Sequence, residues 1–156
     1  MIDEVWNAWA AGFVDGEGSV MLIYNRPKQI TRRGRVETKP GQVAVHVRAS
    51  QTVEVPLLRL EMMYGGSVKA LDMSMKSRFK NVRQMYEWNI FGGNAISALR
   101  KMRPYMMVKQ QHADLAIEYY ELCNDGIGNL DLRLKFWEEM RELQHKGIHL
   151  RKAAIA

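Results

Sequence analysis

Cysteine is almost absent from this 156-residue chain, in which Cys123 is the only one. A single cysteine excludes an internal disulfide and fits a reducing compartment. Long apolar runs are absent too: no stretch of about eighteen apolar residues occurs, so we expect no membrane-spanning helix. The first residues include Asp3 and Glu4 but no basic segment, so we expect no secretory signal. These absences favour an intracellular protein.

Internal repeats are also absent, and this bears on the number of domains. At 156 residues, with a hydrophobic fraction of 47%, the chain is long enough for one globular core. We therefore expect a single domain over residues 1–156, with a core over about 3–124 and a helical extension over about 130–146.

Negative charge is scarce in two segments, residues 26–48 and 69–83. They hold 12 of the 23 lysines and arginines but only two of the 17 acidic residues. The rest of the chain is therefore mildly acidic, although the net charge is +6. A distribution that makes one side of a protein basic suits a polyanion, most simply a nucleic acid. A solvated basic surface is the alternative interpretation.

What is present is a helix end rich in small residues. Ala8, Gly12 and Gly16 recur every four positions and so share one face of a helix. Two of them lack a Cβ, which lets another backbone approach closely. Glu17 follows directly, beside the Gly18 that ends the helix, and presents a carboxylate where two such helices would meet. Since the stretch occurs once, we expect the second helix to come from a second chain.

The hydrophobic pattern predicts helices and strands in a definite order, and the alternation over 42–51 is the most regular strand signal. We expect, in turn, a helix over 3–16, a strand over 19–25, a polar loop, a strand over 41–51, a helix over 56–64, strands over 67–74 and 83–91 joined by a basic turn over 77–81, a short helix from 94, a helix over 105–123, a loop over 125–129 and a helix over 130–144.

This order predicts an α+β fold in which four antiparallel strands have helices on one face only. The uncovered face would carry the hydrogen-bonding side chains of Gln42, His46 and Arg48. A DNA major groove admits strands as well as helices, so this face is a candidate reading surface.

In its motif and in the order of its elements the chain resembles the LAGLIDADG homing endonucleases, in particular the single-motif homodimeric type encoded in introns. Residues 10–18 match the nine-residue motif of the family in register. Phe13 and Val14 replace Leu and Ile, Gly16 replaces Ala, and Glu17 replaces the second Asp.

Three further features carry the resemblance. The αββαββα order matches, the strand over 41–51 matches, and residues 103–111 resemble the family's segment of a proline, an aromatic residue and a Lys-Gln pair. The resemblance implies the αββαββα homing-endonuclease fold, which is a saddle-shaped antiparallel four-stranded sheet with helices on one face, followed by C-terminal helices.

The resemblance also implies an activity. The chain would be a site-specific endonuclease for intron homing, cutting both strands of a long pseudo-palindromic DNA site and leaving short 3′ overhangs. Glu17 would be the acidic metal ligand and the Gly16 carbonyl a supporting ligand, while Gln51 and Lys109 would be catalytic residues near the scissile phosphate. The homodimer interface that the resemblance implies comprises Ala8, Gly12, Asp15 and Gly16.

A divalent metal suits this chemistry, because it can activate water, orient the attack and neutralise the leaving oxygen. Two Glu17 carboxylates across a twofold axis would repel one another, and a cation removes that repulsion. Mg²⁺ accepts carboxylate, carbonyl, water and phosphate oxygens. We therefore expect Mg²⁺, with Mn²⁺ or Ca²⁺ able to replace it for binding. Asp15 would be structural and close the helix ends rather than bind metal.

The sheet face and the basic loops supply the candidate contacts to double-stranded DNA. We expect Arg48 to read guanine and Gln42 to read adenine, since these side chains form paired hydrogen bonds with those bases. Met21, Ile23 and Ala44 would meet thymine methyl groups. The predicted contacts on the sheet are Ser19, Met21, Ile23, Asn25, Gln42, Ala44, His46, Arg48, Ser50, Lys69, Leu71, Arg83, Met85 and Glu87. The predicted phosphate contacts from loops are Arg32, Arg33, Arg35 and Arg78.

Two other functions stay open: an intron maturase that binds its own intron RNA, and a catalytically inactive DNA-binding regulator. The presence of Glu17 and Lys109 favours the nuclease over the regulator and leaves the maturase open. The family often has a second basic residue one turn after the glutamine; here that role is either unfilled or falls to Arg59. The resemblance suggests the cytoplasm or nucleoid of an archaeon or bacterium, or an organelle.

Overall fold

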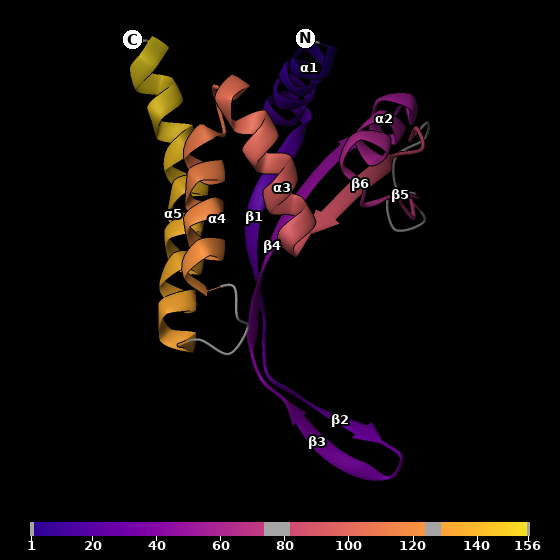
Figure 1. Ribbon diagram of the computed structural model, residues 1–156, viewed down its shortest axis with the longest axis vertical. Coiled ribbons are helices and arrows are strands. Elements are labelled where there is room, and N and C mark those ends of the chain that lie inside the picture. The colour runs from indigo at the N-terminus through magenta and orange to yellow at the C-terminus, as the bar shows by residue number, and fades with distance from the viewer. Residues whose placement is uncertain (1, 74–81, 124–128, 156) are drawn as a thin grey trace.

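The computed structural model describes residues 2–73, 82–123 and 129–155 (Figure 1). Its elements are α1 (Ile2–Glu17), β1 (Gly18–Asn25), β2 (Lys28–Arg32), β3 (Arg35–Lys39), β4 (Gln42–Gln51), α2 (Val55–Tyr64), β5 (Ser67–Ala70), β6 (Tyr86–Phe91), α3 (Gly92–Met102), the 3-10 helix η2 (Arg103–Tyr105), α4 (Gln110–Cys123) and α5 (Leu130–Ile155). The predicted α+β class is confirmed. No helix within these ranges has the length and apolar character needed to cross a membrane.

The main sheet is antiparallel and has the spatial order β1-β4-β6-β5. Its two long strands, β1 and β4, pair along their whole length, so that Ser19 lies opposite Arg48 and Asn25 opposite Gln42. β6 pairs with the other side of β4, which places Asn89 opposite Arg48 as well. Opposed residues on one face therefore form rows that cross three strands.

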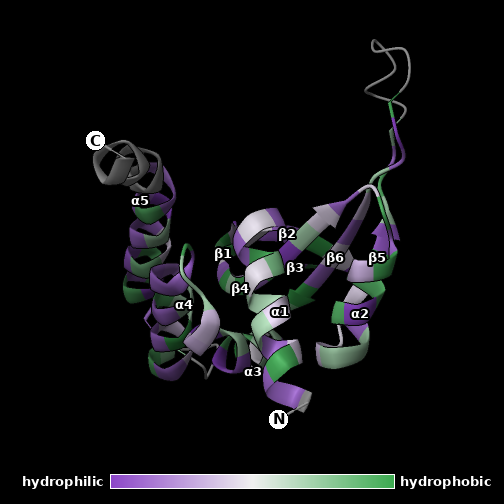
Figure 2. Cartoon of the chain, turned by 90° about the horizontal axis from the view of Figure 1, so that it is seen from above, coloured by the Kyte–Doolittle hydropathy of each residue, from purple (hydrophilic) through white to green (hydrophobic). Residues whose placement is uncertain are grey.

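The core lies between one face of this sheet and the helices. Side chains of a strand point alternately to its two faces, and the buried set on the central strands is Val20, Leu22, Val43, Val45, Val47, Ala49, Trp88 and Ile90. Helices α1, α2 and α3 pack against this layer, and α4 and α5 pack beside it against β1. Seen from above, α1 and α3 lie between α2 on one side and the α4–α5 pair on the other (Figure 2).

The prediction of a polar loop after residue 25 is wrong, because this segment forms a β-hairpin made of β2 and β3. Arg33 and Gly34 form its turn, with φ of 49° and 77°, and two positive φ values are typical of the type I′ turn that suits a two-residue hairpin. Almost all hairpin side chains are exposed, so no apolar alternation marks the strands in the sequence. The hairpin extends from the far ends of β1 and β4, away from the helices (Figure 1).

The predicted strands over 67–74 and 83–91 are too long. β5 ends at Ala70 and β6 begins at Tyr86. The pairing reaches slightly further, because the backbone N–H of Leu71 donates to the carbonyl oxygen of Met85 at 2.8 Å. The basic turn predicted over 77–81 lies outside the described residues.

Two helix boundaries also differ from the prediction. α4 begins at Gln110 rather than at 105, since the segment around Pro104 forms η2 instead. α5 continues to Ile155 rather than ending near 144; a single glycine within it, Gly147, does not break the helix. The loop predicted over 125–129 lies almost wholly outside the described residues.

Candidate functional site

The candidate site is built around the C-terminal end of α1. Glu17 is the last residue of this helix, it is exposed, and β1 begins at the next residue. A Cβ on Gly18 would lie 2.8 Å from the carbonyl oxygen of Val14 and 2.9 Å from that of Arg48. Only glycine therefore fits this corner, where the chain turns from helix into strand. The corner places the backbone of Glu17 at the end of the sheet where β1 begins.

Asp15 joins this corner to the start of α4. Its buried carboxylate accepts three backbone hydrogen bonds, from the N–H groups of Met107 at 2.7 Å, Val108 at 3.1 Å and Lys109 at 2.9 Å. Lys109 directly precedes α4, and N–H groups at a helix start lack partners within the helix and favour a negative charge. Asp15 thus holds together two segments that lie more than 90 residues apart in the chain.

Lys109 is held at the same place by its own side chain. Its Nζ donates to the backbone carbonyl oxygen of Asp15, two residues before Glu17. The predicted catalytic lysine and the predicted metal ligand therefore sit at one helix end. Gln51 is the last residue of β4 and lies at the same end of the sheet as the start of β1, since Gly18 lies opposite Ala49.

The Gln51 side chain bonds to the next residue, Thr52, which follows β4. Its Oε1 accepts hydrogen bonds from the backbone N–H of Thr52 at 2.8 Å and from the Thr52 hydroxyl at 3.2 Å. The Nε2 group takes no part in these two bonds. Glu17, Lys109 and Gln51 thus belong to three segments that converge at the end of α1.

His112 lies one turn into α4, three residues after Lys109, and the sequence reasoning missed it. Burial lowers the pKa of this imidazole, the charge of Lys109 lowers it further, and Asp15 opposes the shift. Its Nδ1 atom is buried and has no hydrogen-bond partner among the described residues. The lowered pKa favours the neutral form of His112, beside Lys109. Only the sequence spacing of three from Lys109 could have pointed to it.

The donors at the end of α1 suit Mg²⁺ better than a softer metal. They are a carboxylate and the backbone carbonyl of Gly16, and both are oxygens. Mg²⁺ is commonly bound through one or two carboxylates, with water and substrate phosphate completing the shell. Within residues 2–73, 82–123 and 129–155, no three His, Cys, Asp or Glu side chains cluster in a way that would hold a metal ion. One chain would therefore supply only part of the oxygen shell that a divalent cation takes.

Arg59 does not lie in this site. Its guanidinium stacks over the ring of Trp6, 4.5 Å from the ring centroid. Trp6 is near the opposite end of α1, about 16 Å along the helix from Glu17 at 1.5 Å per residue. The structure therefore does not bring Arg59 to the position of a second basic residue.

The face of α1 that carries the small residues is open. Gly12 and Gly16 are exposed, and a Cβ added to either would meet, apart from its own stretch of helix, no atom of the described residues within 4 Å. Ala8 is half-buried, whereas Asp15 is buried against the segment before α4. Exposed apolar surface adjoins this helix end, since Met107 is 90% and Val108 52% exposed. A single chain therefore leaves the small-residue stripe and two apolar side chains uncovered.

The uncovered sheet face carries the predicted reading residues in register. Ser19, Met21, Ile23 and Asn25 on β1 lie opposite Arg48, His46, Ala44 and Gln42 on β4. Lys69 on β5 lies opposite Glu87 on β6. Arg83 is exposed, Leu71 and Met85 are half-buried, and Arg32, Arg33 and Arg35 are exposed at the hairpin turn. Arg78 lies outside the described residues.

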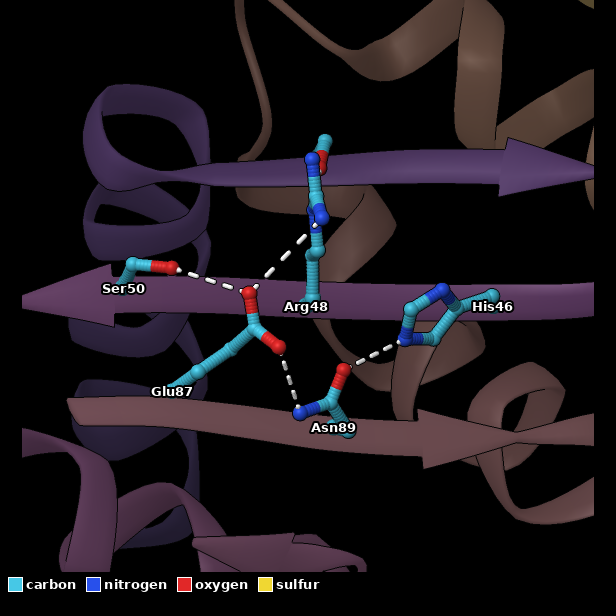
Figure 3. A network of polar contacts seen from close by, with 6 residues as sticks. His46, Arg48, Ser50, Glu87 and Asn89 are labelled. Carbon is cyan, nitrogen blue, oxygen red and sulfur yellow. Dashed lines mark hydrogen bonds and ion pairs between the residues drawn. The ribbon is translucent and has the colours of Figure 1, made fainter. Parts of the chain in front are cut away.

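A network of polar side chains occupies the middle of this face (Figure 3). Its members come from β4 and β6, namely His46, Arg48, Ser50, Glu87 and Asn89, and Ser19 of β1 joins it through Arg48. His46 is buried, with 6% exposed, and stacks on Phe91 at 4.2 Å between ring centroids. Sequence reasoning missed Asn89, although its alternation with Glu87 on β6 places it on this face.

Neither a protein-family model nor a curated protein matches this chain. Its structure is similar to that of the homing endonuclease I-CvuI in complex with its target in the presence of Ca, at 22% identity and a TM-score of 0.64, covering 91% of this chain and 83% of that one. A second I-CvuI complex, in the presence of Mg, is 25% identical, with a TM-score of 0.58 and coverage of 96% and 83%.

The archaeal intron-encoded homing endonuclease I-Vdi141I, complexed with DNA, is similar as well. It is 15% identical, with a TM-score of 0.62, and the match covers 98% of this chain and 99% of that one. The similarity therefore extends over nearly the whole of both chains.

Proposed function

The chain has the fold of the LAGLIDADG homing endonucleases, and we propose that it is a metal-dependent endonuclease that cuts double-stranded DNA at a long specific site. The observation that carries the proposal is the convergence of Glu17, Lys109 and Gln51 at the end of α1, beside an uncovered sheet face with hydrogen-bonding side chains. By its resemblance, the proposed role is intron homing.

Two copies of the chain would make the working unit. Gly12 and Gly16 leave room for a second helix, and Met107 and Val108 add exposed apolar surface beside it. Pairing two α1 helices along this stripe would bring the two Glu17 carboxylates together. A twofold dimer presents the same reading face twice, so its target would be pseudo-palindromic.

Each group at the end of α1 then has a proposed role. Glu17 and the Gly16 carbonyl would hold Mg²⁺, and when bound this ion would activate water and neutralise charge on the phosphate. Lys109, fixed on the Asp15 carbonyl, would place a positive charge beside the scissile phosphate. The Gln51 amide would hold ordered water or a phosphate oxygen. The basic hairpin, with Arg32, Arg33 and Arg35, would contact phosphates and fix the register on DNA.

The experiment is cleavage of DNA that spans the site into which the gene's own intron inserts. The protein should cut both strands with Mg²⁺ and leave them intact with EDTA, since the carboxylate site needs the ion. Tight binding of this DNA without any cleavage in Mg²⁺ would contradict the nuclease and support a DNA-binding regulator.

The dimer is tested separately with Gly12→Leu. Leucine has space in the single chain and a higher helix propensity than glycine, so the monomer should stay folded. The added side chain blocks close approach of two helices, so light scattering should report a monomer. Glu138→Leu is the matched control, because it adds the same side chain to the exposed side of α5, and it should leave the dimer intact. A dimeric Gly12→Leu protein would contradict pairing through α1.

A further inference from the structure

A carboxylate lies in the middle of the face that is proposed to read DNA. Glu87 accepts hydrogen bonds from the Ser50 hydroxyl at 3.3 Å and from the Asn89 amide at 3.0 Å. Its Oε2 also lies 3.7 Å from Nη1 of Arg48 (Figure 3). A negative charge on such a face opposes binding to phosphates at any sequence. Its presence there therefore points to a role in choosing the sequence.

The network below Glu87 fixes its position. A carboxylate only accepts hydrogen bonds, so the Asn89 nitrogen faces Glu87 and the Asn89 oxygen faces His46. The Nε2 atom of His46, 2.7 Å from that oxygen, must then carry the hydrogen. Phe91 stacks on the imidazole and holds it in place. His46 thus bonds to Asn89, and Asn89 bonds to Glu87, so the buried imidazole supports the carboxylate through Asn89.

Arg48 is held beside Glu87 but keeps donors for a ligand. Its Nε donates to the Ser19 hydroxyl at 3.2 Å, and Nη1 faces Glu87. A guanidinium has five N–H donors, so both Nη2 hydrogens and one on Nη1 have no partner within the described parts of the chain. The Arg48 side chain is 47% exposed, whereas that of Glu87 is 18% exposed. Arg48 and Glu87 together therefore offer two adjacent donors followed by an acceptor.

This order of donors and acceptor matches one type of base pair. In the major groove a G·C pair presents the guanine acceptors N7 and O6, followed by the cytosine N4 donor. An A·T pair presents an acceptor, a donor and an acceptor. We propose that Arg48 and Glu87 read one G·C pair in each half-site, with Arg48 donating to guanine N7 and O6 and Glu87 accepting from cytosine N4. This inference rests on the proposed function and names a feature of its target.

The test measures base preference at every position of the half-site. Full-length protein is mixed with a duplex library in which each base pair is varied, and bound DNA is sequenced. The wild type should require G·C at one position per half-site. Glu87→Gln, whose amide both donates and accepts, should reduce that preference roughly 10-fold. Arg48→Lys should reduce the preference at the same position, because lysine cannot form the paired contact.

Glu37→Gln is the matched control. It removes the same charge from the exposed hairpin, outside the network, and should leave the G·C preference unchanged while binding strengthens uniformly. Arg48→Lys alters an exposed side chain. If Glu87→Gln fails to fold, the base preference of Arg48→Lys still tests whether this position of the half-site is read as G·C.

Two results would overturn the reading of a G·C pair while leaving the proposed function standing. In one, Glu87→Gln strengthens binding to all sequences equally, and the base preference stays as in the wild type. In the other, Glu87→Gln and Arg48→Lys change the preference at different positions. A wild-type protein without any sequence preference would overturn the proposed function, and the base-pair reading with it.

Discussion

Removing the Asp15 carboxylate should destabilise the protein far more than removing an ordinary surface carboxylate. Asp15 is 9% exposed and accepts hydrogen bonds from three consecutive backbone N–H groups, those of Met107, Val108 and Lys109. In Asp15→Ala all three donors lose their partner. These bonds join α1 to the start of α4, so their loss affects the packing of two distant segments.

The magnitude follows from the number of donors and their access to water. A buried donor left without a partner costs about 1–3 kcal/mol. Met107 and Val108 are exposed at 90% and 52%, so water can replace part of what their N–H groups lose. We therefore expect Asp15→Ala to reduce the free energy of unfolding by about 3–4 kcal/mol. Asp15→Asn keeps one acceptor oxygen and should cost about half as much.

The assay is urea denaturation followed by tryptophan fluorescence, since the chain has four tryptophans. Asp114→Ala is the control: Asp114 lies on exposed α4 surface and pairs with Arg103 at 2.6 Å and 2.9 Å, which lowers the pKa of the Asp114 carboxyl. An exposed pair is screened by solvent, so its loss should be much smaller. An Asp15→Ala protein as stable as Asp114→Ala would refute the account of Asp15.

Two further predictions concern glycine and histidine. Gly18→Ala should lower the melting temperature, since its Cβ would lie under 3.0 Å from the carbonyl oxygens of Val14 and Arg48; an unchanged melting temperature would mean that the corner can relax. Burial lowers the pKa of His46 in the folded state, so below about pH 6.5 the unfolded chain binds more protons and stability falls as the pH falls. His46→Gln should flatten this pH dependence in thermal melts, and an equal slope in both proteins would contradict the burial of a neutral imidazole. The pKa of His112 is lowered as well, so it contributes to any pH dependence of stability that remains in His46→Gln.

Much of the sheet could be predicted from the sequence, because strand periodicity survives into the fold. The alternation over 42–51 predicts one polar face, and the register places Ser19 opposite Arg48 on that face. The hairpin over 28–39 could not be predicted in this way: both of its faces are polar and exposed, so no alternation distinguishes strand from loop.

The contacts around the candidate site were only partly predictable. The motif singles out Asp15 and Glu17, but nothing local indicates that Asp15 would bond to residues more than 90 positions away. Asn89 was missed because the register of the second strand pair is weakly marked in the sequence. Its role emerges only when the sheet places it between His46 and Glu87.

The most direct test of the account is to compare binding and cleavage in Glu17→Gln. Glutamine keeps the size of the side chain but not its charge, and Glu17 is exposed, so the fold and the reading face should be unaffected. We expect Glu17→Gln to bind DNA within a few-fold of the wild type and to show no detectable cleavage of either strand in Mg²⁺. Cleavage at the wild-type rate by Glu17→Gln would contradict the central claim that this carboxylate holds the catalytic metal.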